Sequence, residues 1–335
     1  MKTKAFRIVS IFLLVTSILA VILVTAGAIA KYNLVKKYPA PGQLVDVGGY
    51  KLHINCTGQG NPTVILEAGQ GDYSLIWAYV QPEIAKNNRV CTYDRAGYGW
   101  SEPSPYPRTA NAEMEELHTL LVNANIQGPY VLVGHSLGGM LVRVYAHNFP
   151  DDVIGMVLVD SYHEERPVRN PELTTLNRDA AEQFRLFAFL SSTGIMALAP
   201  QSIPNRGLPD VAYAQYQAIT ATTGYFETFI DEIFALPESA AEVRAMRITS
   251  LEHMPLIVIS PGHWDEVASL TDTENQQLWT AFQVQQSELV ALSSDSIQII
   301  AEQSGHDVQI DQPDVVIDAI REIVMRVLQD QQIDK

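Results

Sequence analysis

This sequence is poor in cysteine, and its two cysteines form no recognisable metal or redox motif. Cys56 and Cys91 are the only two among 335 residues. Their spacing fits neither a pair of zinc ligands nor a C-x-x-C motif. We therefore expect no metal site and no dithiol chemistry. The expected state is two buried free thiols, with a disulfide as the alternative in an oxidising compartment.

Basic residues are also few. The chain has 22 Lys and Arg against 38 Asp and Glu, for a formal net charge of -16. Such a chain repels nucleic-acid phosphates, and no run of Lys and Arg interrupts its acidic globular part, so nucleic acid is excluded as a partner. We interpret the acidic residues as a solvated surface. Hydrophobic residues make up 47% of the chain, which excludes intrinsic disorder.

One long apolar run is present near the N-terminus. It extends from Ile8 to Ala30 and follows three basic residues. At helical rise it is long enough to cross a bilayer core of about 30 Å, so residues 1–37 are predicted to be a single-pass membrane anchor with its flank. A cleaved signal peptide is the alternative, because residues 28–30 fit a small-x-small site, although the run exceeds the usual length of about 7–15 residues. We expect the N-terminus inside and the remainder outside.

After the anchor, short β-rich runs alternate with helical stretches, which predicts a mainly parallel sheet with crossover helices. Residues 38–43 are predicted to be a linker, and residues 44–330 an α/β domain. The predicted strands are Lys51–Asn55, Thr63–Glu67, Arg89–Tyr93, Tyr130–Val133, Val153–Val159, Leu256–Ser260 and Ser296–Ile300.

Residues of about 161–250 interrupt this alternation. They are rich in Ala, Phe, Leu and Tyr and contain no β-run, which predicts a helical insertion. Its apolar side chains are expected to form a small core or the apolar wall of a substrate pocket. The spacing of apolar residues in Asp314–Leu328 predicts a last helix that packs on the sheet.

The strongest chemical signal is a G-x-S-x-G motif between a strand and a helix. A β-run from Tyr130 leads into Gly134-His135-Ser136-Leu137-Gly138, and a helical stretch follows. The glycines permit a sharp turn that pushes the serine oxygen out above the sheet. We predict Ser136 as a nucleophile, and a glycine-lined turn with a spectator serine is the alternative.

A serine hydroxyl needs an adjacent base to act as a nucleophile at neutral pH. His306 follows the last β-run, in Ser304-Gly305-His306-Asp307, and precedes the last helix. This is the chain order serine, acid, histidine that a G-x-S-x-G strand-turn-helix predicts. We predict His306 as the general base.

These blocks resemble the α/β-hydrolase family from Leu44 to about Leu328. Glu67-Ala68-Gly69-Gln70-Gly71 lies where that family has its oxyanion loop, and Asp94 to Ser101 resembles its D-x-x-G-x-G-x-S turn. The resemblance implies an eight-stranded, mainly parallel sheet with a helical cap and no cofactor. It also implies an oxyanion hole made by the backbone N–H groups of Gln70 and Leu137. Ala68 departs from the His-Gly form of this loop.

Two aspartates are candidates for the acid that orients His306. Asp160 ends the strand Val153–Val159, and Asp265 lies in Gly262-His263-Trp264-Asp265, which resembles the family's commoner position. We predict Asp160, because a strand end is positioned by the sheet rather than by a loop. Asp265 is the alternative. The family's topology also makes the strands of Cys56 and Cys91 neighbours, so a cross-strand disulfide becomes possible.

The function predicted from these residues is hydrolysis of an ester or related acyl bond of a small molecule, as in a carboxylesterase or lipase. A serine at position 136 argues against haloalkane dehalogenases and epoxide hydrolases, which need a carboxylate nucleophile. Aminopeptidase-like activity and cofactor-free perhydrolase activity are alternatives on the same fold. A non-catalytic, membrane-tethered binding module is the alternative from another class.

Overall fold

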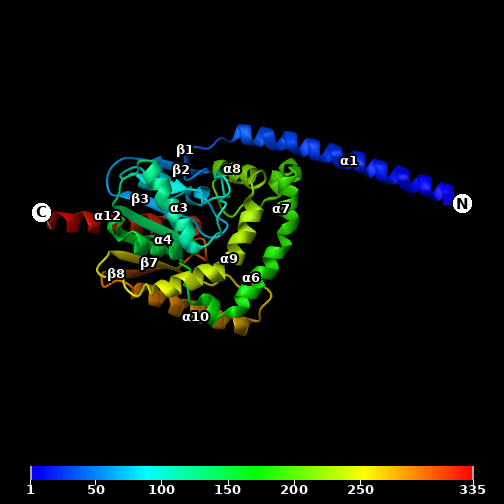
Figure 1. The fold of residues 1–335 in the computed structure, drawn as a ribbon. Coiled ribbons are helices and arrows are strands. Elements are labelled where there is room, and N and C mark those ends of the chain that lie inside the picture. The colour runs from blue at the N-terminus through cyan, green and yellow to red at the C-terminus, as the bar shows by residue number, and fades with distance from the viewer. Residues whose placement is uncertain (1, 334–335) are drawn as a thin grey trace.

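The computed structural model describes residues 2–333, and at its centre is an eight-stranded sheet (Figure 1). The strand order is β1-β2-β4-β3-β5-β6-β7-β8. From β4 to β8 neighbouring strands are parallel, whereas β1 and β2 run antiparallel to their neighbours. The predicted fold class is therefore confirmed. The strands are β1 (Gln43–Asp46), β2 (Lys51–Thr57), β3 (Thr63–Glu67), β4 (Val90–Tyr93), β5 (Tyr130–His135), β6 (Val153–Val159), β7 (Leu256–Pro261) and β8 (Ser296–Ala301).

Helices cover both faces of the sheet, as the continuous apolar strands require. Alternate residues of β3 face opposite layers, with Val64 packed in the layer that contains Ile320 and Ile65 in the layer that contains Leu117. The α-helices that pack on the sheet are α2 (Gln81–Ile84), α3 (Ala110–Asn123), α4 (Leu137–Asn148), α10 (Asp272–Val290), α11 (Val308–Asp311) and α12 (Pro313–Ile333), with short 3-10 turns η1 (Ser74–Trp77) and η2 (Pro150–Asp152).

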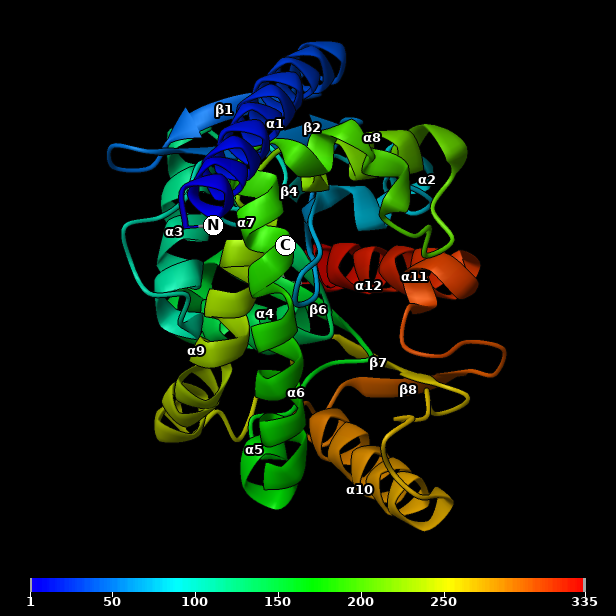
Figure 2. The same ribbon diagram turned by 90° about the vertical axis from the view of Figure 1, so that its right-hand side faces the viewer.

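The interval between β6 and β7 is helical, and it lies above the carboxyl edge of the strands (Figure 2). We call this segment the cap. Aromatic side chains hold it together, with the rings of Phe184 and Phe226 6.0 Å apart. Its elements are α5 (Arg166–Arg169), α6 (Pro171–Gln183), α7 (Arg185–Ser192), η3 (Ile195–Leu198), η4 (Pro200–Ser202), α8 (Asp210–Thr220) and α9 (Tyr225–Met246).

The N-terminal apolar run forms the helix α1 (Lys2–Lys37), which projects away from the rest of the molecule (Figure 1). An 18-residue window within its stretch from Lys4 to Lys37 has a mean hydropathy of 2.9, and its apolar side chains from Phe6 to Val24 are exposed. The helix is long and apolar enough to cross a membrane.

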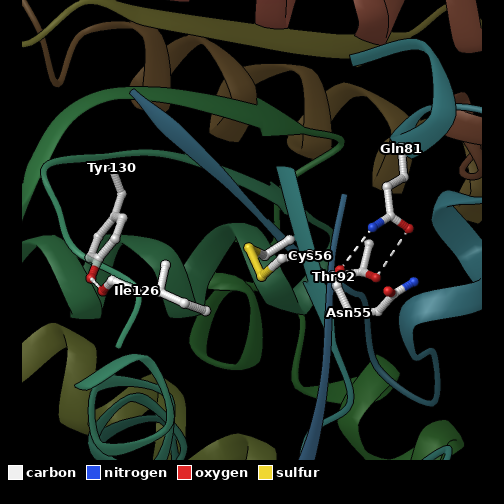
Figure 3. The surroundings of a disulfide bond; sticks show 7 residues. Asn55, Cys56, Gln81, Thr92, Ile126 and Tyr130 are labelled. Carbon is white, nitrogen blue, oxygen red and sulfur yellow. Dashed lines mark hydrogen bonds between the residues drawn. A yellow bond between two sulfur atoms is a disulfide. The ribbon is translucent and has the colours of Figure 1, made fainter. Parts of the chain in front are cut away.

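The expectation of free thiols is wrong, because Cys56 and Cys91 form a disulfide with their Cα atoms 4.0 Å apart (Figure 3). The reason is the register of β2 and β4, which places these two residues directly opposite each other in an antiparallel pair. Beside the disulfide, the Gln81 side chain of α2 joins the same two strands. It donates to the carbonyl of Asn55 and accepts from the hydroxyl of Thr92.

Candidate active site

Ser136 lies in a strained turn between β5 and α4. Its backbone has φ 52° and ψ -120°, outside the regions that side-chain-bearing residues favour. A Cβ atom at Gly134 would lie 2.4 Å from the carbonyl oxygen of Gly138, so the turn needs a glycine there. The Ser136 N–H donates to the carbonyl of Val159 at the end of β6. The sheet therefore holds the serine at its carboxyl edge.

His306 and Asp160 meet at the same edge. Nδ1 of His306 lies 2.5 Å from Oδ2 of Asp160. A carboxylate can only accept, so Nδ1 carries the proton and Nε2 is left as the basic nitrogen. Asp160 is buried and has φ 44°, which shows that the chain bends sharply after β6 to present this carboxylate.

The Asp160 carboxylate sets the basicity of His306. Burial lowers the pKa of the imidazole, but the charge of Asp160 and its hydrogen bond outweigh burial, so the pKa is raised above the usual 6.5. The His306 side chain is 44% exposed, which leaves it accessible to a reacting group.

Asp265 also contacts His306, but not its ring. Its Oδ2 accepts from the backbone N–H of His306 at 2.9 Å. The side chain of Asp265 is 63% exposed, whereas that of Asp160 is 5% exposed. The structure thus brings both candidate aspartates to the histidine, one to the imidazole and the other to the loop that carries it.

His135 contacts the loop that carries His306, and the sequence did not predict this contact. Its Nε2 donates to the carbonyl of His306 at 2.9 Å, and the two rings lie 4.7 Å apart. Burial lowers the pKa of His135 and so favours the neutral ring. Because His135 directly precedes Ser136, it links the serine turn to the histidine loop. The one feature of the sequence that could have indicated a role for His135 is its position inside the G-x-S-x-G motif.

The loop Glu67–Gly71 packs directly against the serine turn. A Cβ atom at Gly138 would lie 2.6 Å from the carbonyl oxygen of Ala68. Within residues 2–333, the N–H groups of Gln70 and Leu137 have no hydrogen-bond partner in the protein. Both amides are therefore free to donate to a ligand oxygen, and Leu137 is the first residue of α4, where helix N–H groups are unpaired.

Arg95 holds that loop in place. Its guanidinium donates to the carbonyls of Ala68 and Gly69 at 2.7 Å each and forms an ion pair with Glu67 at 2.7 Å. Glu232 of α9 in turn accepts from Arg95 at 2.8 Å and from the N–H of Gly71 at 3.1 Å. All of these charges are buried, so the loop is coupled to the cap by a desolvated network.

A second arginine links the cap to the histidine loop. Arg206 donates to Asp72 at 2.6 Å and to Asp307 at 2.8 Å. Asp72, His135 and Asp307 could by residue type share a metal ion, since their ligand atoms lie within 4.8 Å of one another. The guanidinium already supplies the positive charge between the two carboxylates, so this cluster is an arginine-bridged pair.

A cavity of about 300 Å³ lies beside the imidazole. It is walled by α6, by the loop after β7 and by α10. Its lining combines apolar side chains with several polar and charged ones, and such a mixed lining can hold and orient a small molecule. The lining residues are Asp160, Tyr162, Arg166, Leu173, Thr174, Asn177, Pro261, His263, Trp264, Asp265, Val267, Phe282 and His306.

Comparisons with known proteins agree with the fold. The model of the alpha/beta hydrolase fold family matches residues 62–194, which include the serine turn. The protein YqjL of Bacillus subtilis is 28% identical over 266 residues, covering 79% of this chain and 85% of YqjL. A thermophilic esterase from Thermogutta terrifontis superposes with a TM-score of 0.59 and 21% identity, covering 85% of this chain and 99% of the esterase.

Some relatives are much longer than this chain. The vacuolar membrane protein YNL115C of Saccharomyces cerevisiae is 34% identical over 139 residues, which are 36% of this chain and 22% of the yeast protein. The chain thus spans only about a fifth of the length of several curated relatives that it matches. The similarity to them covers less than two fifths of this chain.

Proposed function

We propose that this protein, a member of the α/β-hydrolase fold family, is a serine hydrolase that cleaves an ester or related acyl bond through an acyl-enzyme. The observation that carries the proposal is the contact between Asp160 and Nδ1 of His306. It leaves Nε2 free to accept a proton at the edge of the sheet where Ser136 is held.

In the acylation half, the Ser136 oxygen attacks the carbonyl carbon while His306 takes the hydroxyl proton at Nε2. The buried Asp160 carboxylate stabilises the imidazolium that forms. The N–H groups of Gln70 and Leu137 donate to the carbonyl oxygen as it becomes negative. The bond to the leaving group then breaks, and His306 returns its proton to the leaving oxygen.

In the deacylation half, water replaces the alcohol. His306 removes a proton from the water, whose oxygen attacks the acyl carbon of the Ser136 ester. The tetrahedral intermediate collapses, the carboxylic acid leaves and the Ser136 oxygen recovers its proton from His306. No oxidant, metal or cofactor takes part in this sequence.

The cavity beside His306 suits the leaving group. The leaving oxygen must approach the imidazole that protonates it, so the alcohol part of the substrate lies on the His306 side of the serine. Leu173, Trp264 and Phe282 supply apolar walls there, while Arg166 and Asn177 add polar groups. We infer an ester with a partly apolar alcohol.

We also propose that α1 spans a membrane and holds the catalytic domain outside the cytoplasm. The exposed apolar surface of α1 supports the span. The disulfide between Cys56 and Cys91 supports the location, since disulfides persist in oxidising compartments.

The test is hydrolysis of p-nitrophenyl esters from short to long acyl chains by the full chain in lipid nanodiscs. We expect turnover of at least one ester and its loss, by about 10³-fold or more, in Ser136→Ala. No turnover across the series by the folded chain would contradict the proposal and point to a peptidase or a binding protein.

A further inference from the structure

The anchor helix is packed against the cap. A Cβ atom at Gly27 of α1 would lie 2.7 Å from the backbone carbonyl carbon of Gly194, which immediately precedes η3. Such a backbone-to-backbone approach is the way small residues join helices in membranes. Gly27 is buried, whereas the large apolar residues from Ile8 to Val24 are exposed. The cap therefore meets α1 toward the end of its apolar run, and Ala28 and Ile29 next to the contact are again exposed.

This contact places the cap at the bilayer surface. The exposed stretch from Ile8 to Thr25 has a helical length of about 27 Å, close to the thickness of a hydrocarbon core of about 30 Å. If that stretch fills the core, Gly27 and the residues it touches lie at the lipid boundary. This step depends on the membrane span proposed for α1.

The cap presents an apolar helix face toward the same side. In α7, Leu186 is 62% exposed and Phe189 is 60% exposed, while Ala188 and Ser191 are buried. In Figure 1, α7 lies beyond α9 on the side toward which α1 projects, and in Figure 2, viewed from that side, α7 lies in front of α9. We call the exposed pair Leu186 and Phe189 the α7 face. It points away from the cap's own core.

We propose that the α7 face docks onto the bilayer that α1 crosses, and that the occupant of this surface is lipid. The continuity with α1 supports lipid rather than a soluble partner. Arg185, the one charged residue of α7, pairs with Glu182, so the face carries no free cation for anionic headgroups. With a net charge of -16, the chain must dock by apolar burial.

Docking has a consequence for the substrate. The helix before α7 is α6, and its residues Leu173 and Asn177 line the cavity beside His306. One wall of the cavity would therefore belong to the cap segment that rests on lipid. An ester dissolved in the bilayer would reach that wall without first crossing water.

Spin labels can measure the docking directly. Both native cysteines are in the disulfide, so an introduced cysteine is the only thiol to label. The variants are Leu186→Cys and Phe189→Cys on the α7 face and Leu14→Cys in the exposed stretch of α1. Met325→Cys, 51% exposed on α12 at the far end of the molecule, is the control.

The readout is collision with oxygen, which concentrates in lipid, against collision with a water-soluble nickel chelate, for the full chain in phosphatidylcholine vesicles. We expect labels at positions 186, 189 and 14 to favour oxygen and the label at 325 to favour nickel. Nickel preference at 186 and 189 with oxygen preference at 14 overturns the docking and leaves the anchor intact. Nickel preference at 14 overturns the anchor and, with it, the docking.

The contact of Gly27 gives a second, matched test. Gly27→Leu cannot fit against the Gly194 backbone, whereas Ala28→Leu changes an exposed neighbour on α1. We expect Gly27→Leu to shift the label at position 189 toward nickel without moving the label at 14, and Ala28→Leu to change neither. An unchanged label at 189 in Gly27→Leu would show that the α1 contact does not orient the cap. Because neither test uses catalysis, a failure of the proposed hydrolase activity remains distinguishable.

Discussion

Asp160 and Asp265 differ in what they can do for His306. Asp160 touches the imidazole, so it can hold the tautomer and balance the charge that forms during attack. Asp265 touches only the backbone N–H of His306, so it can position the loop and nothing more. The two aspartates therefore have separate roles.

Substitution of each aspartate by asparagine should separate these roles. We expect Asp160→Asn to lower kcat by about 10³–10⁴-fold, because an amide favours the wrong tautomer. Asp265→Asn should cost about tenfold at most, the value of one hydrogen bond. Turnover of a p-nitrophenyl ester measures both. Equal, mild losses would reject the assignment of the catalytic acid.

The same contact predicts the pH dependence. The pKa of His306 is raised and the base must be neutral, so kcat/KM should increase with pH through a midpoint above 6.5. NMR titration of the His306 ring in Ser136→Ala should give the same midpoint. In the Ser136→Ala/Asp160→Asn double variant the midpoint should move to lower pH. The same midpoint in the single and double variants would contradict the proposed pairing of Asp160 with His306.

The sequence predicted Ser136 and His306 because both lie in local motifs. It left Asp160 and Asp265 open, since only their distances to the histidine distinguish them. His135 and Glu232 were missed because their partners are 171 and 137 residues away in the sequence, and no local pattern marks such a pair.

At the scale of elements, the cap is joined to the histidine loop by Arg206. This residue lies between η4 and α8, and it bridges Asp72 and Asp307. Burial raises the pKa of Asp307, but the positive charges around it, of which Arg206 is the largest, together outweigh burial and keep the pKa below its usual value. Cap and loop should therefore open together rather than separately.

Removing this bridge should loosen both elements. We expect Arg206→Gln to destabilise the closed cap by about 2 kcal/mol, since the side chain is partly exposed and water screens the pair. Hydrogen exchange of residues 200–209 and 305–311 should rise. Arg185→Gln is the matched control, because Arg185 pairs only with Glu182 on the exposed side of the cap. Equal hydrogen exchange in both variants would show that Arg206 does not hold the cap and the histidine loop together.

The strands show how far elements could be predicted. Seven apolar runs correspond to β2 to β8, with ends that differ by at most two residues. The strand β1 was missed, because its four residues Gln43–Asp46 are mostly exposed and lack an apolar pattern. It exists because β2 offers an unpaired edge.

At the scale of the whole molecule, the fold followed from the sequence, but the relation of α1 to the cap did not. A run of apolar residues predicts a span by composition alone. The contact between Gly27 and Gly194 depends on two backbones meeting in space, and glycine carries no hydrophobic signal. The disulfide likewise depended on the register of two strands.

That disulfide should stabilise the whole domain. It closes a loop with a sequence separation of 35, and in the chain-entropy model such a link is worth about 2–4 kcal/mol. We expect Cys56→Ala/Cys91→Ala to lower the free energy of unfolding of the full chain in detergent by that amount. Urea unfolding measures it. An unchanged urea midpoint in the double variant would show that the disulfide does not stabilise the domain.

The most direct test of the central claim is mass mapping of the full chain after reaction with a fluorophosphonate probe. The account predicts one adduct, on the peptide that contains Ser136, and none in a folded Ser136→Ala variant. No adduct on the folded chain, or an adduct on another serine, would contradict it.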